Sequence, residues 1–337
     1  MQNIIKIFIA ACLVYSCASI PANTHTQTDR IAVGAGPEDI LIDTLSTNRA
    51  RLLVSSMDHR LQGDAPNGNI YAIDLDQANP KSYRLMRTNE PEGHDFHPHG
   101  FDIIRYEGKV YLYIVSHDEK KEEHYVYKYE VQDKTLKFVR SFTHKLMNSP
   151  NTVVALKDGG FYVSNDQGKR GNQLAVLLRA KSGSILYCNG ADSWARAADK
   201  LAFPNGLYVT PKQRYLYAST TRQNKLFKYT MKPDGNLLNR EKATHLVGGD
   251  NIRLSPNKSL LITGHLNASK FIGHFKDSSK TSPSVVYDVN MQNGEKQVVY
   301  ANDGQQISAA STAVEYKGYL YIAQVFEPFI LKVKRQK

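Results

Sequence analysis

Cysteine and tryptophan are scarce in this chain of 337 residues, which holds three cysteines and one tryptophan. Cys12 and Cys17 lie close to the N-terminus, outside the expected folded domain, so Cys188 is the one cysteine expected within that domain. A single cysteine cannot form an internal disulfide, so the folded part must be held together by core burial and by any metal that it binds. Cys188 follows an apolar run and is interpreted as a buried small hydrophobic residue rather than as a nucleophile.

Long hydrophobic runs are missing too. The run Ile7–Ser16 follows a short basic head; it is too short to span a bilayer comfortably but fits the hydrophobic segment of a signal peptide. Ser16-Cys17-Ala18, at its end, looks like the cleavage site of a bacterial lipoprotein in which Cys17 is lipidated. We therefore predict a signal peptide over residues 1–17, a polar tether over 18–29 and one folded domain over 30–337. The expected location is exported, as a periplasmic or outer-membrane lipoprotein or else as a secreted protein, with membrane contact only through the lipid anchor. An uncleaved anchor is the alternative.

Dense clusters of one charge are absent, although the formal net charge is +11. Lys and Arg are scattered, and the densest pair, Lys120 and Lys121, is followed at once by Glu122 and Glu123. This pattern indicates a solvated basic surface and predicts no nucleic-acid partner. The sequence also has no Gly-x-Ser-x-Gly motif, so a serine nucleophile on a strand-to-helix elbow is not expected.

Strand-forming residues are abundant, with 20 Tyr and 12 Phe among many Val and Ile, and 22 Gly supply turns. Short β-rich runs recur about every 50 residues, at Leu52–Val54, Tyr111–Val115, Phe161–Val163, Tyr215–Tyr217, Leu260–Ile262 and Leu320–Ile322. A second run follows each of them, at Ile70–Ile73, Tyr125–Tyr127, Ile185–Tyr187, Leu226–Tyr229, Val285–Tyr287 and Ile330–Val333. Six strand pairs at this period predict an all-β fold, a six-bladed β-propeller with four-stranded blades.

Turn residues stand where the hairpins of an antiparallel meander should reverse, for example at Asn67-Gly68, Asp234-Gly235 and Lys317-Gly318. A β-sandwich or barrel is the rival architecture, but six pairs exceed what one sandwich needs. Closing the ring requires the segment Arg30–Val33 to complete the blade formed near Phe329–Val333.

One segment departs from the strand pattern. Leu174, Leu177 and Leu178 have helical spacing within the segment Asn172–Ala180. We therefore predict a small lid helix there, over one end of the channel.

Polar residues keep the same period as the strands. The innermost strand of each blade lines the central channel and should precede the middle strand of that blade in sequence. One polar residue stands at each such place: Glu38, His99, Asn151, Asn205, Asn251 and Ser311. Taken singly these are ordinary loop residues, since Asn205 lies in a Pro-Asn-Gly turn and Asp250-Asn251 is a common loop pair.

Five of the side chains at or beside this ring offer oxygen atoms: Glu38, Asn151, Asn205, Asp250 and Asn251. Calcium takes about six to eight oxygen ligands, so water and a substrate oxygen would complete its shell. Zinc is less suitable, because the ring lacks Cys and has too few His for a tetrahedral site. The sequence thus predicts a calcium site in the channel.

Several short motifs, in one order over about residues 34–326, resemble the paraoxonase/arylesterase family. They are Gly36-Pro37-Glu38-Asp39, His97-Pro98-His99-Gly100, His144-Lys145-Leu146, Ser164-Asn165-Asp166, Pro204-Asn205-Gly206, Asp250-Asn251-Ile252 and Val314-Glu315-Tyr316-Lys317-Gly318. The resemblance implies a six-bladed propeller with two calcium ions that hydrolyses lactones, aryl esters and, slowly, some organophosphates. It also implies that the five residues found from their spacing hold the catalytic calcium.

The resemblance assigns roles to four further side chains. His99 and His117 match the family's catalytic His–His pair, His265 matches a histidine of the substrate pocket, and Asp166 matches a carboxylate behind the metal ligands. His94, His97 and His124 are interpreted as structural histidines.

The chain departs from the family pattern in three places. The second, structural calcium would be held by Asp39 and the carbonyl of Phe101, but Thr152 stands where the family has an Asp, which removes a charged ligand. The family's disulfide between the chain ends has no counterpart. The segment 167–182 is more basic and less aromatic than in the family, so substrate preference is not carried over.

Together these features predict calcium-dependent hydrolysis of small carboxylic esters, with lactones and aryl esters as substrates. The metal would polarise the carbonyl, and His99, tuned by His117, would take a proton from water; Glu38 is the alternative base. A non-catalytic propeller that calcium merely clamps, acting as an exported binding module, is the alternative function. A sugar-lactonase-like enzyme with another divalent metal is the third reading.

Overall fold

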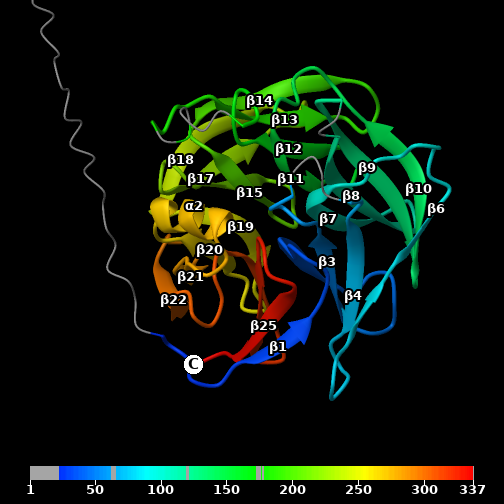
Figure 1. The fold of residues 1–337 in the computed structure, drawn as a ribbon. Helices are drawn as coiled ribbons and strands as arrows, with labels where there is room; N and C mark the ends of the chain where they lie inside the picture. The colour runs from blue at the N-terminus through cyan, green and yellow to red at the C-terminus, as the bar shows by residue number, and fades with distance from the viewer. Residues whose placement is uncertain (1–22, 62–65, 119–120, 172–175, 177, 337) are drawn as a thin grey trace, which may run out of the picture.

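The computed structural model describes residues 23–61, 66–118, 121–171, 176 and 178–336. These residues form six sheets arranged around a central axis, which is a six-bladed β-propeller as predicted (Figure 1). The signal peptide predicted over residues 1–17 and most of the lid helix predicted over 172–180 fall outside the described residues. Within the described part of the chain, no helix is long and apolar enough to cross a membrane.

The first three blades follow one another along the chain, and we number their strands as in Figure 1. Blade 1 consists of β2 (Asp39–Asp43), β3 (Arg51–Ser56), β4 (Asn69–Asp74) and β5 (Ser82–Arg84). Blade 2 consists of β7 (Pro98–Tyr106), β8 (Lys109–Asp118), β9 (Glu123–Gln132) and β10 (Thr135–Phe142). Its outer edge carries a fifth strand, β6 (Met86–Thr88), paired parallel to β10. Blade 3 consists of β11 (Pro150–Ala155), β12 (Phe161–Asn165), β13 (Gly183–Cys188) and β14 (Trp194–Leu201).

The other three blades complete the circle. Blade 4 consists of β15 (Pro204–Val209), β16 (Tyr215–Thr220), β17 (Lys225–Met231) and β18 (Leu237–His245). Blade 5 consists of β19 (Gly249–Leu254), β20 (Leu260–His265), β21 (Ser284–Val289) and β22 (Lys296–Asn302). Blade 6 consists of β23 (Ala310–Tyr316), β24 (Tyr319–Gln324), β25 (Phe329–Lys334) and, from the other end of the chain, β1 (Asp29–Ala32).

The ring closes as the sequence predicted. Strand β1 pairs antiparallel with β25, with Arg30 opposite Leu331 and Ala32 opposite Phe329. The first strand of each blade contacts the first strand of the next, from β2 around to β23 and back to β2, so these strands line the channel. Between β23 and β24 the reversal falls at Lys317 and Gly318, whose φ angles of 47° and 78° suit a two-residue hairpin.

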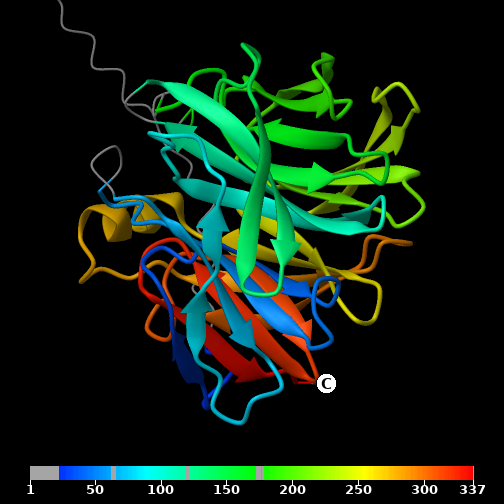
Figure 2. The same ribbon diagram turned by 90° about the vertical axis from the view of Figure 1, so that its right-hand side faces the viewer.

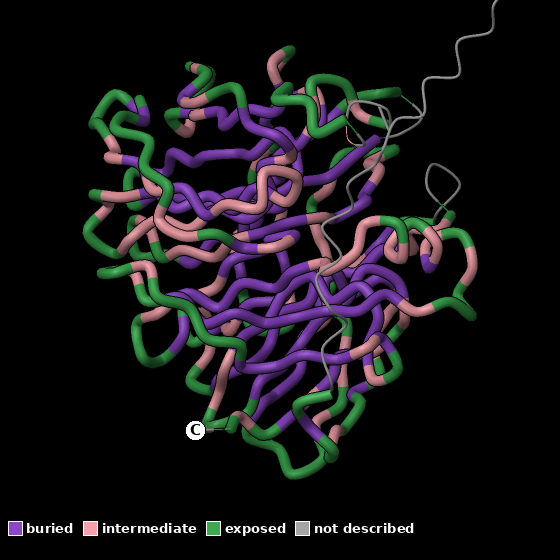
Figure 3. The backbone as a smooth tube through the Cα atoms, turned by 90° about the vertical axis from the view of Figure 1, so that its left-hand side faces the viewer, coloured by how far each residue is buried: buried purple, intermediate pink, exposed green. Residues whose placement is uncertain are grey.

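Apolar side chains fill the spaces between neighbouring blades. Leu53 of blade 1 packs with Phe101 and Leu112 of blade 2, and equivalent clusters join the other pairs of blades. The inner strand β11 is buried along its whole length, whereas the outermost strand of blade 4, β18, is largely exposed, and burial falls from the channel outwards (Figure 3). Cys188 lies fully buried in one of these clusters, which confirms its interpretation as a core residue.

A short helix that the sequence did not predict, α2 (Ala268–Lys276), follows β20. Asn267 caps its N-terminus by accepting a hydrogen bond from the Lys270 N–H. Phe271 and Phe275 pack against Phe326, which lies between β24 and β25, so α2 covers the junction of blades 5 and 6. Figure 2 turns the molecule so that blade 2, with its long strands β9 and β10, faces the viewer.

Candidate metal and catalytic site

The predicted ring residues lie where the pairing of the two innermost strands is interrupted. The register between these strands shifts at the same level in five blades, between Pro98 and Phe101, Pro150 and Val153, Pro204 and Leu207, Gly249 and Ile252, and Ala310 and Ala313. The residues skipped by these shifts include His99, Asn151, Asn205, Asp250, Asn251 and Ser311. A β-bulge releases residues from the ladder and redirects their side chains, so each blade can aim a polar group at the channel. Glu38 directly precedes β2 in blade 1.

Glycines next to these residues allow the inner strands to approach one another. A Cβ atom on Gly206 would lie 2.6 Å from the carbonyl oxygen of Asp250, and one on Gly100 would lie 2.5 Å from Oγ1 of Thr152. A residue with a side chain would therefore push neighbouring blades apart at the channel. Gly206 thus has a packing role besides the turn role that the Pro-Asn-Gly sequence suggests.

Glu38 meets two histidines at the channel. Its Oε2 atom lies 2.9 Å from Nε2 of His59 and 3.2 Å from Nε2 of His99. No well-aligned hydrogen bond joins Glu38 Oε2 to Nε2 of His59 despite this short distance. The contact therefore brings together atoms that could each coordinate a metal ion. Such an arrangement can hold a metal ion.

His59 is the residue that the sequence analysis missed. It follows β3, the second strand of blade 1, whereas the ring residues predicted from the sequence precede the second strands. His117, Asp166 and His265 also lie at or just after the ends of second strands, in blades 2, 3 and 5. This second recurring position is the sequence signal that would have pointed to His59.

Four of the five predicted calcium ligands present a buried oxygen that has no hydrogen-bond partner among the described residues. The oxygens are Glu38 Oε2, Asn151 Oδ1, Asn205 Oδ1 and Asp250 Oδ1. An unpaired buried oxygen is costly, and most native examples are explained by a ligand, an ion or a water. Unpaired oxygens from four different blades at one level of the channel fit a cation.

The other polar atoms of these ligands are fixed by neighbours. Asn151 Nδ2 lies 3.4 Å from Asp166 Oδ2, and His265 Nε2 lies 2.7 Å from Asp250 Oδ2. In the fifth ligand, Asn251, Nδ2 donates to Thr312 Oγ1 at 2.9 Å. Partners of this kind orient ligand oxygens before a metal arrives. Asp166 and His265 thus lie beside two of the predicted ligands.

Charge at the site favours a cation as well. Burial alone would raise the pKa of Glu38, but His99 and His59 outweigh it and lower this pKa to about 2, so Glu38 is ionised. Burial raises the pKa of Asp250, and the negative charge of Glu38 raises it further, whereas the contact with His265 lowers it. Two carboxylates that repel each other at the ring are stabilised by a positive ion between them.

The predicted catalytic histidines are neighbours. The ring centroids of His99 and His117 are 5.4 Å apart, and Nδ1 of His99 lies 2.9 Å from the carbonyl oxygen of Asn151. Burial lowers the pKa of His99 to about 4 and that of His117 well below its usual value, so both rings are neutral at neutral pH. His124, interpreted from the sequence as merely structural, has its Nδ1 3.0 Å from Nδ1 of His117.

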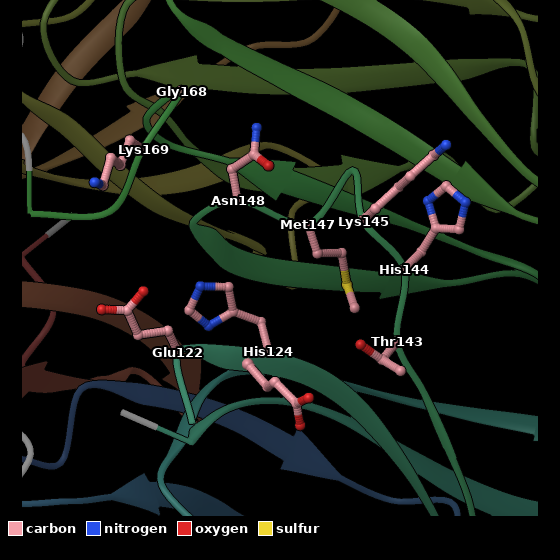
Figure 4. Close-up of a pocket in the computed structure, with 10 residues that line it drawn as sticks. Glu122, His124, Thr143, His144, Lys145, Met147, Asn148, Gly168 and Lys169 are labelled. Atoms are coloured by element: carbon pink, nitrogen blue, oxygen red, sulfur yellow. The ribbon is translucent and has the colours of Figure 1, made fainter. Parts of the chain in front are cut away.

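A pocket of about 440 Å³ opens beside His124, between the start of β9 and the loops that flank β11 and β12 (Figure 4). It is lined by Glu122, Glu123, His124, Thr143, His144, Lys145, Met147, Asn148, Gly168 and Lys169. Neither Glu38 nor His99 lines it, but His124 does, and His124 contacts His117.

The atoms expected to hold a second calcium are already paired. Asp39 Oδ2 accepts hydrogen bonds from the Phe101 N–H at 3.0 Å and from Nη2 of Arg253 at 2.7 Å. The carbonyl oxygen of Phe101 accepts from the same Arg253 nitrogen at 3.1 Å. Thr152, the substituted position, is buried close to Gly100 in the neighbouring strand. Ser311, the sixth ring residue, donates to the carbonyl oxygen of Glu38 and so ties blade 6 to blade 1.

The profile of the arylesterase family matches residues 54–330, most of the propeller. The chain belongs to the arylesterase family. Human serum paraoxonase/lactonase 3 is 26% identical over 313 residues, which cover 91% of this chain and 87% of that protein. Rabbit (Oryctolagus cuniculus) serum paraoxonase/lactonase 3 is 28% identical over 267 residues, which cover 77% of this chain and 75% of the relative. Membership of the arylesterase family indicates that the chain is a hydrolase.

Solved structures outside the arylesterase relatives share the fold. A gluconolactonase of Xanthomonas campestris superposes with a TM-score of 0.52 at 14% identity, covering 94% of this chain and 100% of that one. The calcium-binding protein regucalcin of Agrobacterium tumefaciens superposes with a TM-score of 0.56 at 10% identity, covering 94% and 96%. At these identities the likeness concerns the propeller alone.

Proposed function

We propose that this arylesterase-family chain is a calcium-dependent hydrolase of carboxylic esters, with lactones and aryl esters as its substrates. The observation that carries the proposal is the ring of unpaired buried oxygens on Glu38, Asn151, Asn205 and Asp250. The name of the human and rabbit relatives, serum paraoxonase/lactonase 3, supports an ester or lactone as the substrate class.

The donor set fits calcium better than zinc. Glu38, Asn151, Asn205 and Asp250, together with Asn251, would hold the ion through oxygen atoms, as calcium prefers. Bound there, calcium supplies Lewis-acid polarisation of the ester carbonyl and stabilises the negative charge that develops on its oxygen.

His99 is the base in this proposal. Its Nδ1 faces the Asn151 carbonyl at 2.9 Å and carries the ring proton, which leaves Nε2 with a lone pair. A pKa of about 4 keeps the ring neutral and able to accept a proton at neutral pH. Water adds to the ester carbon as it gives a proton to Nε2, and this proton then passes to the departing alkoxide or phenoxide. The net reaction adds one water across the C–O bond, with Glu38 left to its ligand role.

Turnover on phenyl acetate and on γ- and δ-lactones tests the proposal. Activity that a chelator removes and added calcium restores is the expected result. His99→Gln should slow turnover by about 10²–10⁴-fold, because a positioned general base typically contributes that much, while calcium stays bound. The exposed His245 offers the control His245→Gln, which should keep full activity. Folded, calcium-loaded wild-type protein with no turnover on a broad ester panel would instead favour the binding module.

We also propose export as a lipoprotein, on the basis of the Ser16-Cys17-Ala18 sequence after the apolar run. Labelling of expressing bacteria with a radioactive fatty acid tests this proposal. Wild-type protein should carry the label and Cys17→Ala should not; equal labelling of both would contradict it.

A further inference from the structure

The Arg253 side chain donates hydrogen bonds to residues of two other blades. It lies on β19 of blade 5, yet it contacts blades 1 and 2 across the channel, past blade 6. Its Nε atom donates to the carbonyl oxygen of Ile40 at 2.6 Å. Nη2 donates to Asp39 Oδ2 at 2.7 Å and to the carbonyl oxygen of Phe101 at 3.1 Å. The side chain is only 13% exposed and the Asp39 carboxylate is completely buried.

The three acceptors form the kind of group that usually surrounds a hard metal ion. One carboxylate and two backbone carbonyls from two blades converge on one place, as they do around calcium. Here the guanidinium group supplies the positive charge, and its planar set of donors matches carboxylate and carbonyl oxygens. Neither oxygen of Asp39 is left unpaired, since Oδ1 accepts from the Ile40 N–H and from Thr312 Oγ1, both at 2.9 Å.

The contrast with the first site is direct. Glu38 and Asp250 each present an unpaired buried oxygen, whereas both oxygens of Asp39 and the carbonyl of Phe101 are occupied by donors of the chain itself. The neutral Thr152 fits the same pattern, because a guanidinium carries one positive charge where calcium carries two. With one charge fewer to balance, a second carboxylate is not needed at position 152.

We propose that Arg253 is a built-in cation that takes the place of the second, structural calcium that the family resemblance implies, so that the chain holds at most one calcium ion. Arg253 then joins blades 1, 2 and 5 permanently, whatever the calcium concentration. Removing calcium should empty the ring at Glu38 without releasing this junction.

Calcium stoichiometry tests the proposal without recourse to activity. The full chain is stripped with a chelator, dialysed against calcium and analysed for calcium per chain by atomic emission. Wild-type protein should hold at most one ion, and Asp39→Asn, if folded by circular dichroism, should hold as much calcium as wild type. Two ions in the wild type, or the loss of one ion in folded Asp39→Asn, would overturn the assignment.

A gain of metal provides the converse test. The double variant Arg253→Ser/Thr152→Asp frees the three oxygens and restores a carboxylate, so it should bind one calcium more than wild type. Thr152→Asp alone should gain none, because the guanidinium still fills the place, and Arg214→Ser, at an exposed arginine, serves as the matched control. A folded double variant with no extra calcium would count against the proposal; if it does not fold, the wild-type and Asp39→Asn stoichiometries decide. A wild type without any calcium would contradict the proposed calcium dependence but not the role of Arg253.

Discussion

His117 and His124 are joined through their Nδ1 atoms, which lie 3.0 Å apart with both rings buried. At this distance one ring donates its Nδ1 proton to the other, so the contact couples the tautomers of the two rings and orients His117. His124 also lines the pocket beside the site, so it connects this pocket with His117, a member of the proposed catalytic pair.

Replacement of His124 should therefore affect catalysis more than stability. We expect His124→Phe to lower kcat about tenfold with little change in KM, because His117 loses its partner while the substrate contacts remain. His124→Asn, which keeps a polar partner, should lose less, and His245→Gln is the exposed control. Steady-state kinetics on a lactone measure the effect, and an unchanged kcat in His124→Phe would remove His124 from the mechanism.

Asn205→Ala removes one unpaired oxygen from the ligand ring. A ligand at 100 times its Kd stabilises the native state by about 2.7 kcal/mol, so weaker calcium binding must reduce this gain. We expect the variant to melt like wild type in chelator but clearly below it in calcium. Asn257→Ala, in an exposed turn, should melt like wild type in both buffers. Equal melting temperatures of Asn205→Ala and wild type in calcium would show that Asn205 is not a ligand.

His265 should act on calcium through Asp250. Its Nε2 lies 2.7 Å from Asp250 Oδ2, and its ring packs 4.6 Å from that of Phe271. His265→Phe keeps the packing and removes the polar contact, so calcium affinity should fall about 10–100-fold, as is usual for residues that orient ligands. Isothermal titration with calcium measures the change, and His265→Gln should lie between the variant and wild type. Unchanged affinity in His265→Phe would mean that Asp250 is oriented by other contacts.

Asp102 should give the stability curve a distinct pH dependence. Burial raises its pKa to about 6 from an ordinary value of 3.8, although Arg253 and the Ala155 N–H oppose the shift. Between these values the folded state holds a proton that the unfolded state has lost, so this residue's contribution to stability falls as the pH rises through the window. The full change is on the order of 2–3 kcal/mol.

Asp102→Asn should remove that dependence. Relative to wild type, its free energy of unfolding should rise by about 2–3 kcal/mol between about pH 4 and about pH 7, as measured by urea denaturation. Parallel curves for the two proteins over this range would show that the Asp102 carboxyl titrates normally.

The repeated parts of the molecule were accessible from the sequence. Each blade repeats the same strand pair, so the period revealed six blades. Asn151 and Asn205 recur at one bulged level of the inner strands, and Glu38 stands just before the inner strand of blade 1. The closure of the ring by the segment Arg30–Val33 followed from the architecture, because the chain ends of a propeller must meet, whereas the register of Arg30 opposite Leu331 was not predicted.

The parts that do not repeat were not accessible. His59 reaches Glu38 from a loop after β3, and α2 is an insertion in blade 5 with no equivalent elsewhere in the described residues. Arg253 crosses the channel on a long flexible side chain, and no sequence period records where such a side chain ends. The role of Arg253 depends on which oxygen atoms surround its guanidinium group in the folded protein.

The closure of blade 6 also dictates an order of events in folding. Strand β1 is among the first parts of the domain to be synthesised, but its partner β25 is made last, so Arg30 must wait for Leu331. No cysteine pair can hold the ends together in the meantime. The final closure is a contact between the most distant parts of the chain, which is slow because of its loop entropy. The ring of blades therefore stays open while the domain is being synthesised, and it closes only after β25 has been made and has paired with β1.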